Sequence, residues 1–241
     1  MLSVLLMLLV EAQESNPLSV AFSDPEKAGE FRANLLAGWM VVQGYEGKAV
    51  QVEVAEVRSG KAEEGELRHL NPGVSGLRLQ EASNVVTMVM SPQLRSPRIT
   101  VRVPVGTNLK LRSTAGEAVV VEGVRGDIEI RSTGARVELA EVSGGVVAQT
   151  LKGGVTARFK QVDPGKELRF QSVHGAIDVT LPERIQARLR METRRGKVFT
   201  NFELKRAGKQ EGRVTEGELN GGGPSYGFTT GTGDIYIRKG R

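Results

Sequence analysis

A short alternating motif recurs along the middle of the chain at a nearly constant spacing. Each copy is three residues long, and the copies begin at residues 109, 119, 128, 137, 146 and 155. After an insertion around residues 163–165, the motif returns at residues 168, 177, 187 and 198. Side chains alternate between the two faces of a strand, so the first and third residues of each triplet share one face. The repeat therefore predicts a series of short β-strands, each starting about nine residues after the last.

Glycine-containing turns separate the triplets. The chain has 30 glycines in 241 residues, which is well above the usual share, but only 9 prolines. Glycine adopts tight-turn conformations at little steric cost. Short strands between such turns fit a meander, a sandwich or a solenoid, and the constant period favours a solenoid. We therefore expect an all-β fold, a single β-solenoid or β-helix-like domain with about nine residues per strand–turn unit, with either two or three strands per coil.

This domain is expected to span residues 13–241. Residues 30–104 also show strand patterns, although they are less regular, and residues 24–37 could instead form one or two helical turns. Residues 58–72 are charged and contain Gly and Pro, which predicts an exposed loop. Residues 220–241 contain a Gly-rich turn and two alternating segments, and these predict terminal strands that end the stack.

The first ten residues are almost entirely apolar. This run is too short to span a bilayer and fits the hydrophobic region of a signal peptide, with Val10 and Ala12 at the −3 and −1 positions of a cleavage site. A buried strand is the alternative interpretation. We expect residues 1–12 to be a signal peptide and the protein to be exported to the periplasm, the cell surface or the medium.

Composition excludes several classes of chemistry. The chain has no Cys, so it forms no disulfide and has no thiolate-ligated metal and no thiol nucleophile. Its two histidines, His69 and His174, lie far apart in sequence, and no metal site is predicted. The net charge of +5 is mild, and the basic residues are not interleaved with aromatic ones, which argues against nucleic-acid binding.

The ordered set of motifs resembles a bacterial adhesin family with β-strand repeats, a domain of unknown function found in cell-envelope proteins. The resemblance covers roughly residues 17–241. It rests on an early strand pair at residues 38–50, on Gly76-Leu77-Arg78, on residues 99–104, on the Gly-Asp-Ile repeat at residues 126–130, on Gly222-Gly223-Pro224 and on residues 233–237. The resemblance implies a β-solenoid-like fold and an envelope setting, and it implies no catalytic residues.

Catalysis or binding on the outer surface would depend on which outward side chains lie together on neighbouring coils. Glycoside hydrolysis needs two carboxylates about 5–9.5 Å apart, and neither two nor three strands per coil places outward triplet carboxylates on adjacent coils. Four arginines recur at one outward strand position: Arg112, Arg131, Arg158 and Arg190. Arg112 and Arg131 are neighbours with two strands per coil, whereas Arg131, Arg158 and Arg190 align with three strands per coil. Like charges in a row favour an anionic ligand, so these arginines are the candidate anion-contacting surface.

Together these features predict a non-enzymatic, exported structural or interaction module of the bacterial envelope, with no cofactor. The expected partner is an envelope component such as an acidic polysaccharide or an anionic lipid. Oligomerisation through the edges of the terminal coils is a further expectation. The alternative is a polysaccharide-processing enzyme on a β-helix scaffold.

Overall fold

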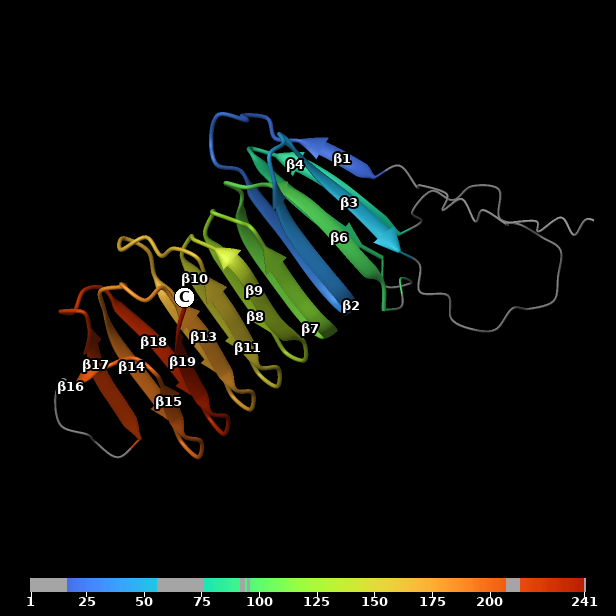
Figure 1. Cartoon of the computed structure of the whole chain (residues 1–241). Helices are drawn as coiled ribbons and strands as arrows, with labels where there is room; N and C mark the ends of the chain where they lie inside the picture. The colour runs from blue at the N-terminus through green and yellow to red at the C-terminus, as the bar shows by residue number, and fades with distance from the viewer. Residues whose placement is uncertain (1–16, 56–75, 92–93, 95, 207–212, 241) are drawn as a thin grey trace, which may run out of the picture.

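The computed structural model describes residues 17–55, 76–91, 94, 96–206 and 213–240. All the regular secondary structure in this part of the chain is β, in 19 strands, and none of it is a helix that could cross a membrane. The strands build two walls that enclose an apolar core, and successive coils stack along one axis (Figure 1). The all-β solenoid-like fold predicted from the repeat is therefore confirmed. The predicted signal peptide and the predicted loop at residues 58–72 lie outside the described residues.

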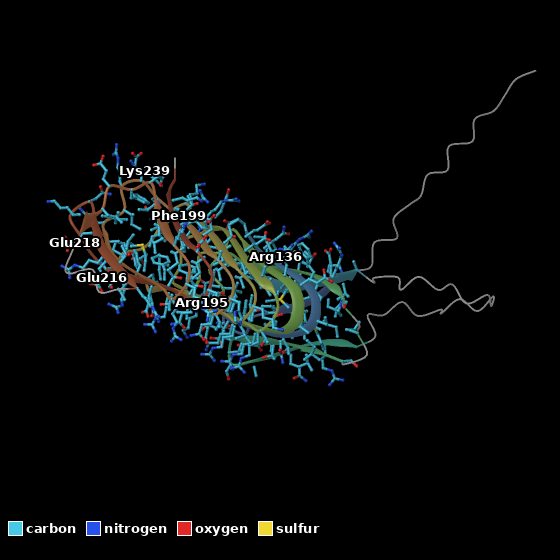
Figure 2. All side chains as sticks on the ribbon, turned by 90° about the horizontal axis from the view of Figure 1, so that it is seen from below. Arg136, Arg195, Phe199, Glu216, Glu218 and Lys239 are labelled. Atoms are coloured by element: carbon cyan, nitrogen blue, oxygen red, sulfur yellow. The ribbon has the colours of Figure 1, made fainter. Side chains whose placement is uncertain are left out.

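Each wall is a continuous ladder of hydrogen-bonded strands. In order along the stack, wall A contains β4 (Leu77–Ala82), β5 (Val85–Met90), the first part of β2 (Glu30–Tyr45), the first part of β7 (Asn108–Glu122), β8 (Ile128–Ser132), β10 (Val146–Thr150), β12 (Leu168–Ser172), β18 (Ser225–Thr230), β14 (Ala187–Thr193), β17 (Val214–Leu219) and β16 (Lys205–Arg206). Wall B contains β1 (Leu18–Ala21), β3 (Ala49–Ala55), β6 (Arg98–Pro104), the second parts of β2 and β7, β9 (Arg136–Val142), β11 (Val155–Phe159), β13 (Ile177–Leu181), β19 (Ile235–Lys239) and β15 (Val198–Thr200). The long strands β2 and β7 contribute to both walls, and Figure 2 shows the ribbon in this region curving around the core.

The central coils contain two strands each. Strand β10 pairs in parallel with β8 on one side and with β12 on the other, while β11 pairs in the same way with β9 and β13. Val146 lies beside Ile128, 18 residues earlier, so two nine-residue units complete one turn of the solenoid. Of the two arrangements that the repeat allows, the structure shows the one with two strands per coil.

Alternation within each triplet determines which residues enter the core. Val137 and Leu139 of β9 are buried, at 0% and 2% exposure, whereas the side chain of Glu138 between them is 45% exposed. Phe159 of wall B meets Phe170 of wall A edge to face, with ring centroids 6.2 Å apart. The register predicted from the alternation is confirmed here, because the apolar faces of both walls meet in one core.

A ladder of hydroxyl groups and glycines forms one corner of the coils. The last inward residue of the wall A strands is Ser or Thr in coil after coil: Ser132, Thr150, Ser172, Thr230 and Thr193. The hydroxyl of Ser172 accepts the Gly175 N–H at 2.8 Å and donates to the Gly153 carbonyl at 3.1 Å. A Cβ on Gly175 would lie 2.3 Å from that same carbonyl oxygen. Glycine is therefore required at this turn because the neighbouring coil occupies the space.

The last two strands of the chain are inserted into the stack and do not cap it. Strand β18 lies between β12 and β14, and β19 lies between β13 and β15. The expectation that the last two strands end the stack is therefore wrong. At the other end, β2 lies between β7 on one side and β5 and β6 on the other. The suggested helical turns within residues 24–37 are also wrong, because the alternation of Phe31, Ala33 and Leu35 buries one face of strand β2.

Candidate binding surface

The four arginines predicted to share one outward position do not form a single row. Arg112 of β7 and Arg131 of β8 are register partners on wall A. Arg158 lies on wall B, beside Ala140 and Thr180. Arg190 returns to wall A but lies beside Gly227, the register partner of Arg169.

The position of Arg190 corrects the alignment based on the repeat. The repeat predicts that the triplet beginning at Ala187 continues the register, but the residue of β14 that aligns with Arg169 is Arg190, so the aligned triplet begins two residues later, at Leu189. Leu189 and Met191 therefore lie beside Tyr226 and Phe228 of the inserted strand β18. Arg190 forms an ion pair with Glu216 of β17, which lies at the far end of the stack (Figure 2).

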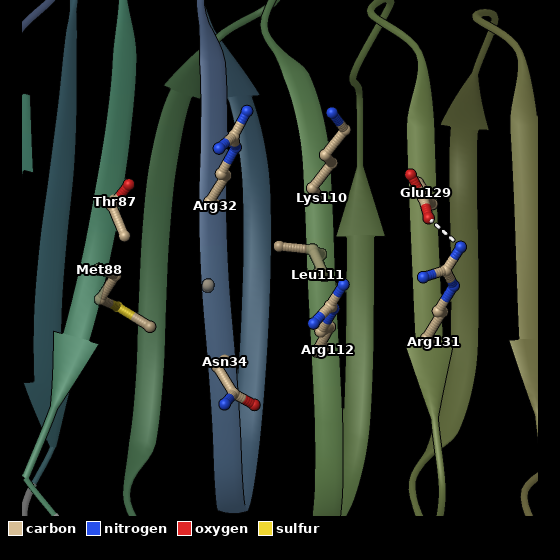
Figure 3. Close-up of a pocket in the computed structure, with 10 residues that line it drawn as sticks. Arg32, Asn34, Thr87, Met88, Lys110, Leu111, Arg112, Glu129 and Arg131 are labelled. Carbon is tan, nitrogen blue, oxygen red and sulfur yellow. Dashed lines mark ion pairs between the residues drawn. The ribbon is translucent and has the colours of Figure 1, made fainter. Parts of the chain in front are cut away.

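A basic groove surrounds Arg112 and Arg131 on the outer face of wall A. It has a volume of about 540 Å³ and lies over β5, β2, β7 and β8 (Figure 3). The close-up shows two parallel lines of side chains across these strands. One line contains Arg32, Lys110 and Glu129, and the other contains Asn34, Arg112 and Arg131.

The cations of the groove differ in how they are neutralised. Glu30 forms ion pairs with both Arg32 and Lys110, the latter at 2.9 Å. Burial raises the pKa of this carboxyl, but the hydrogen bonds from the two cations outweigh it and hold the pKa below its ordinary value of 4.5. Arg131 pairs with Glu129 on its own strand at 2.8 Å. Among the described residues, no carboxylate forms an ion pair with Arg112, so this groove contains an unneutralised guanidinium beside a second arginine.

Several cations on the outer face of wall B are held by carboxylates or by an aromatic ring. Arg238 forms a bidentate pair with Asp178, with donor–acceptor distances of 2.7 and 2.8 Å. The guanidinium carbon of Arg136 lies 4.6 Å from the centre of the Trp39 ring, and its Nε pairs with Glu138. Arg158 is exposed, and no ion pair to it is found within the described part of the chain; Arg98 also has none there, but its guanidinium carbon lies 5.5 Å from the centre of the Trp39 ring. Arg158 therefore provides a matched comparison for Arg112.

Two residues of the groove were missed by the sequence-based interpretation. Arg32 and Asn34 lie on β2, whose partner β7 is more than 70 residues away in sequence. Their alternation with buried residues was visible, but nothing local indicates that β2 inserts beside β7. The groove therefore depends on a long-range pairing that the repeat does not encode.

The structure also places the residues considered for catalysis. His174 is exposed in a turn, whereas His69 lies outside the described residues. On the walls, Glu129 lies between Lys110 and Val147, and Glu138 lies between Val120 and Thr156. Within the described ranges, no group of three or more His, Asp and Glu side chains is placed to hold a metal ion.

No curated protein matches the chain in sequence. Two solved structures are similar over most of the chain. One is described as a "putative cell adhesion protein" from Clostridium sporogenes, with 12% identity, a TM-score of 0.47, and coverage of 93% of this chain and 100% of that chain. The other is described as a "putative adhesin" from Bacteroides fragilis, with 11% identity, a TM-score of 0.33, and coverage of 94% and 98%.

A family model gives the assignment. It matches residues 48–238, which include the repeat, the inserted C-terminal strands and every strand of the two walls except β1 and β2. The adhesin-type family of unknown function indicated by the motif order is thereby confirmed. The chain belongs to the Toastrack DUF4097 family.

Proposed function

We propose that this protein is a non-enzymatic interaction module of the cell envelope that binds an extended anionic ligand on the outer face of wall A. The observation that carries the proposal is Arg112, an exposed guanidinium without a carboxylate partner among the described residues, which lies directly beside Arg131. Like charges on neighbouring strands destabilise a sheet unless an anion lies between them. An anionic ligand would remove that repulsion and gain charge-assisted hydrogen bonds.

The charge of the whole groove supports the same ligand. Four cations line or border it, namely Arg32, Lys110, Arg112 and Arg131, against the two carboxylates of Glu30 and Glu129. All four cations are exposed, so each contact with a ligand would be weak and screened by salt over about 8 Å at physiological ionic strength. Several simultaneous contacts are therefore needed, which favours a polymer or a surface over a small anion.

The envelope setting is part of the proposal. Export is supported by the apolar run that precedes Val10 and Ala12 in the sequence. A rigid stack of strands also suits an envelope module, because it spreads contacts over an elongated face.

Retention on anionic surfaces at increasing salt tests this function. The wild-type protein should be retained at low salt by an acidic polysaccharide matrix and released as salt rises. The double variant Arg112→Gln/Arg131→Gln should bind about tenfold more weakly, since it loses two cations from the groove. Arg158→Gln, the matched exposed arginine of wall B, should bind like wild type.

Two results would contradict the proposal. The first is retention that does not change with salt or is equally reduced by Arg158→Gln. The second is cleavage of the polymer during long incubation, since a binding module leaves its ligand chemically unchanged.

A further inference from the structure

Beyond the groove itself, one line of outward side chains continues across wall A. It contains Asn34, Arg112, Arg131, Gln149, Gln171 and Thr229, which are register partners in turn on β2, β7, β8, β10, β12 and β18. We infer that these six residues, the outer polar row, bind an extended acidic polysaccharide along the axis of the stack. This inference rests on the proposed function and adds the ligand class and the path of the ligand.

The row is built to form hydrogen bonds and carries no negative charge. Across all six strands it presents amides, guanidinium groups and a hydroxyl, and the first carboxylate on this line is Glu192 of β14. Gln149 donates to Gln171 through Nε2 at 3.1 Å. This contact aligns the two amides and leaves the Gln149 carbonyl oxygen and the Gln171 amino group for a ligand. A hydrogen-bonding surface of this length, with two cations followed by uncharged amides and a hydroxyl, suits an acidic sugar polymer better than it suits phosphate alone.

An apolar ridge runs beside the polar row at the corner of the coils. Leu151 and Val173 follow the inward residues Thr150 and Ser172, which are register partners, so they stack on neighbouring coils. Their exposures are 41% and 44%, among the highest for large apolar side chains in the described residues. A sugar ring has polar edges and apolar C–H faces. The polar row can bind the hydroxyl groups at the edges, and the apolar side chains beside it can pack against the C–H faces.

The spacing of the row matches an extended polymer. Parallel strands are about 4.8 Å apart, so the row extends roughly 24 Å over its five strand spacings. Successive rings of an extended polysaccharide advance by a similar step, so each ring would meet about one strand. Arg112 and Arg131 would then bind the carboxylates of neighbouring uronic acid units, and Gln149 and Gln171 would bind the hydroxyls of the units that follow.

Two anionic probes distinguish this ligand from a lipid surface. Oligogalacturonates of increasing length represent the polysaccharide, and vesicles containing phosphatidylglycerol represent an anionic membrane. The variant Gln149→Ala/Gln171→Ala keeps every charge. It should bind the oligogalacturonates about tenfold more weakly, because two ligand hydrogen bonds are lost, and bind the vesicles as wild type does. Gln43→Ala, an outward amide of wall B, is the matched control and should change neither affinity.

Each result has a defined consequence. Affinity that rises with oligomer length until the oligomer reaches the length of the row supports the inference. If Gln149→Ala/Gln171→Ala binds oligogalacturonates normally while Arg112→Gln/Arg131→Gln does not, the polysaccharide path is overturned and anion binding in the groove stands. Equal weakening towards vesicles also overturns the polysaccharide assignment. If the wild-type protein binds neither probe, the inference and the proposed function both fail.

Discussion

Near one corner of wall A, consecutive residues of each strand belong to two different rows of side chains, one inward and one outward. Ser132, Thr150 and Ser172 point inward and carry a hydroxyl in every coil. The residues immediately before them, Arg131, Gln149 and Gln171, point outward and are not restricted to one kind of side chain. The inward line must meet the same turn each time, so its chemistry is constrained, whereas the outward line meets only solvent and its neighbours. The comparison shows that the inward residues of each strand determine the fold. The outward residues are not constrained by the fold and are available for binding.

The largest effect that separates the two faces is expected on β9. Val137→Asp buries a carboxylate without a partner and should destabilise the protein by about 3 kcal/mol or more. Its outward neighbour Glu138 forms an exposed ion pair with Arg136, so Glu138→Gln should change the free energy of unfolding by less than about 0.5 kcal/mol. Urea unfolding of both variants measures the difference. A larger loss in Glu138→Gln would show that the inward and outward assignments are reversed.

A second pair of variants compares two glycines. Gly175→Ala places a Cβ against a backbone carbonyl of the next coil, a contact that cannot be relieved by rotating a side chain, and should cost about 2 kcal/mol or more. Gly227→Ala points outward between Arg169 and Arg190, where nothing lies within 4 Å of the new Cβ. It should be neutral or stabilise by up to about 1 kcal/mol, because Ala restricts the unfolded chain. Thermal melts of both proteins test the pair, and similar melting temperatures would refute the steric account.

A third pair lies within the hydroxyl ladder. Ser172→Ala removes two hydrogen bonds to the turn and should cost about 1–3 kcal/mol. Ser113 occupies the equivalent position on β7, but its hydroxyl is buried with no hydrogen-bond partner among the described residues. There β7 continues through the corner as one strand, so the turn N–H and C=O groups that the other hydroxyls bind are missing. Ser113→Ala should therefore be neutral or stabilising by up to about 1 kcal/mol. Chemical denaturation resolves the two variants, and an equal loss of stability in both would show that the hydrogen bonds of Ser172 do not account for its effect.

The sequence predicts well which residues point inward, but it predicts poorly which outward residues lie beside one another. Val137 and Leu139 were assigned correctly because alternation is a local signal. The ladder also has a local signal, because Thr150, Ser172, Thr193 and Thr230 each lie three residues before a turn glycine, but the triplet motif ends before these positions. Arg190 was misplaced because β18 enters from the end of the chain, and Asn34 was missed because β2 enters from its beginning. Strand pairings over such long sequence distances produce no periodic pattern in the sequence. Which residues line the groove together is therefore known only from the structure.

The smallest effect concerns acid stability at the edge of the groove. The pKa of Glu30 is lowered in the folded protein, so its contribution to stability is present above the ordinary value of 4.5 and is lost as the pH falls through the folded-state pKa. Glu30→Gln should remove this part of the acid dependence. The effect should be under about 1 kcal/mol, because the cations that Glu30 pairs with are half exposed. Unfolding curves between pH 6 and pH 3, compared with wild type, measure it. An unchanged pH dependence would mean that the ion pairs do not act on stability.

Chemical modification of arginine tests the central claim most directly, that the outward line of wall A binds while the rest of the stack serves the fold. The folded wild-type protein is treated with phenylglyoxal with and without oligogalacturonate, and the modified residues are identified by mass spectrometry. Arg112 and Arg131 should be protected by the ligand, and Arg158 on wall B should react as in the free protein. Protection of Arg158 to the same degree, or no protection of Arg112 and Arg131 under conditions where the oligomer binds, would contradict the claim.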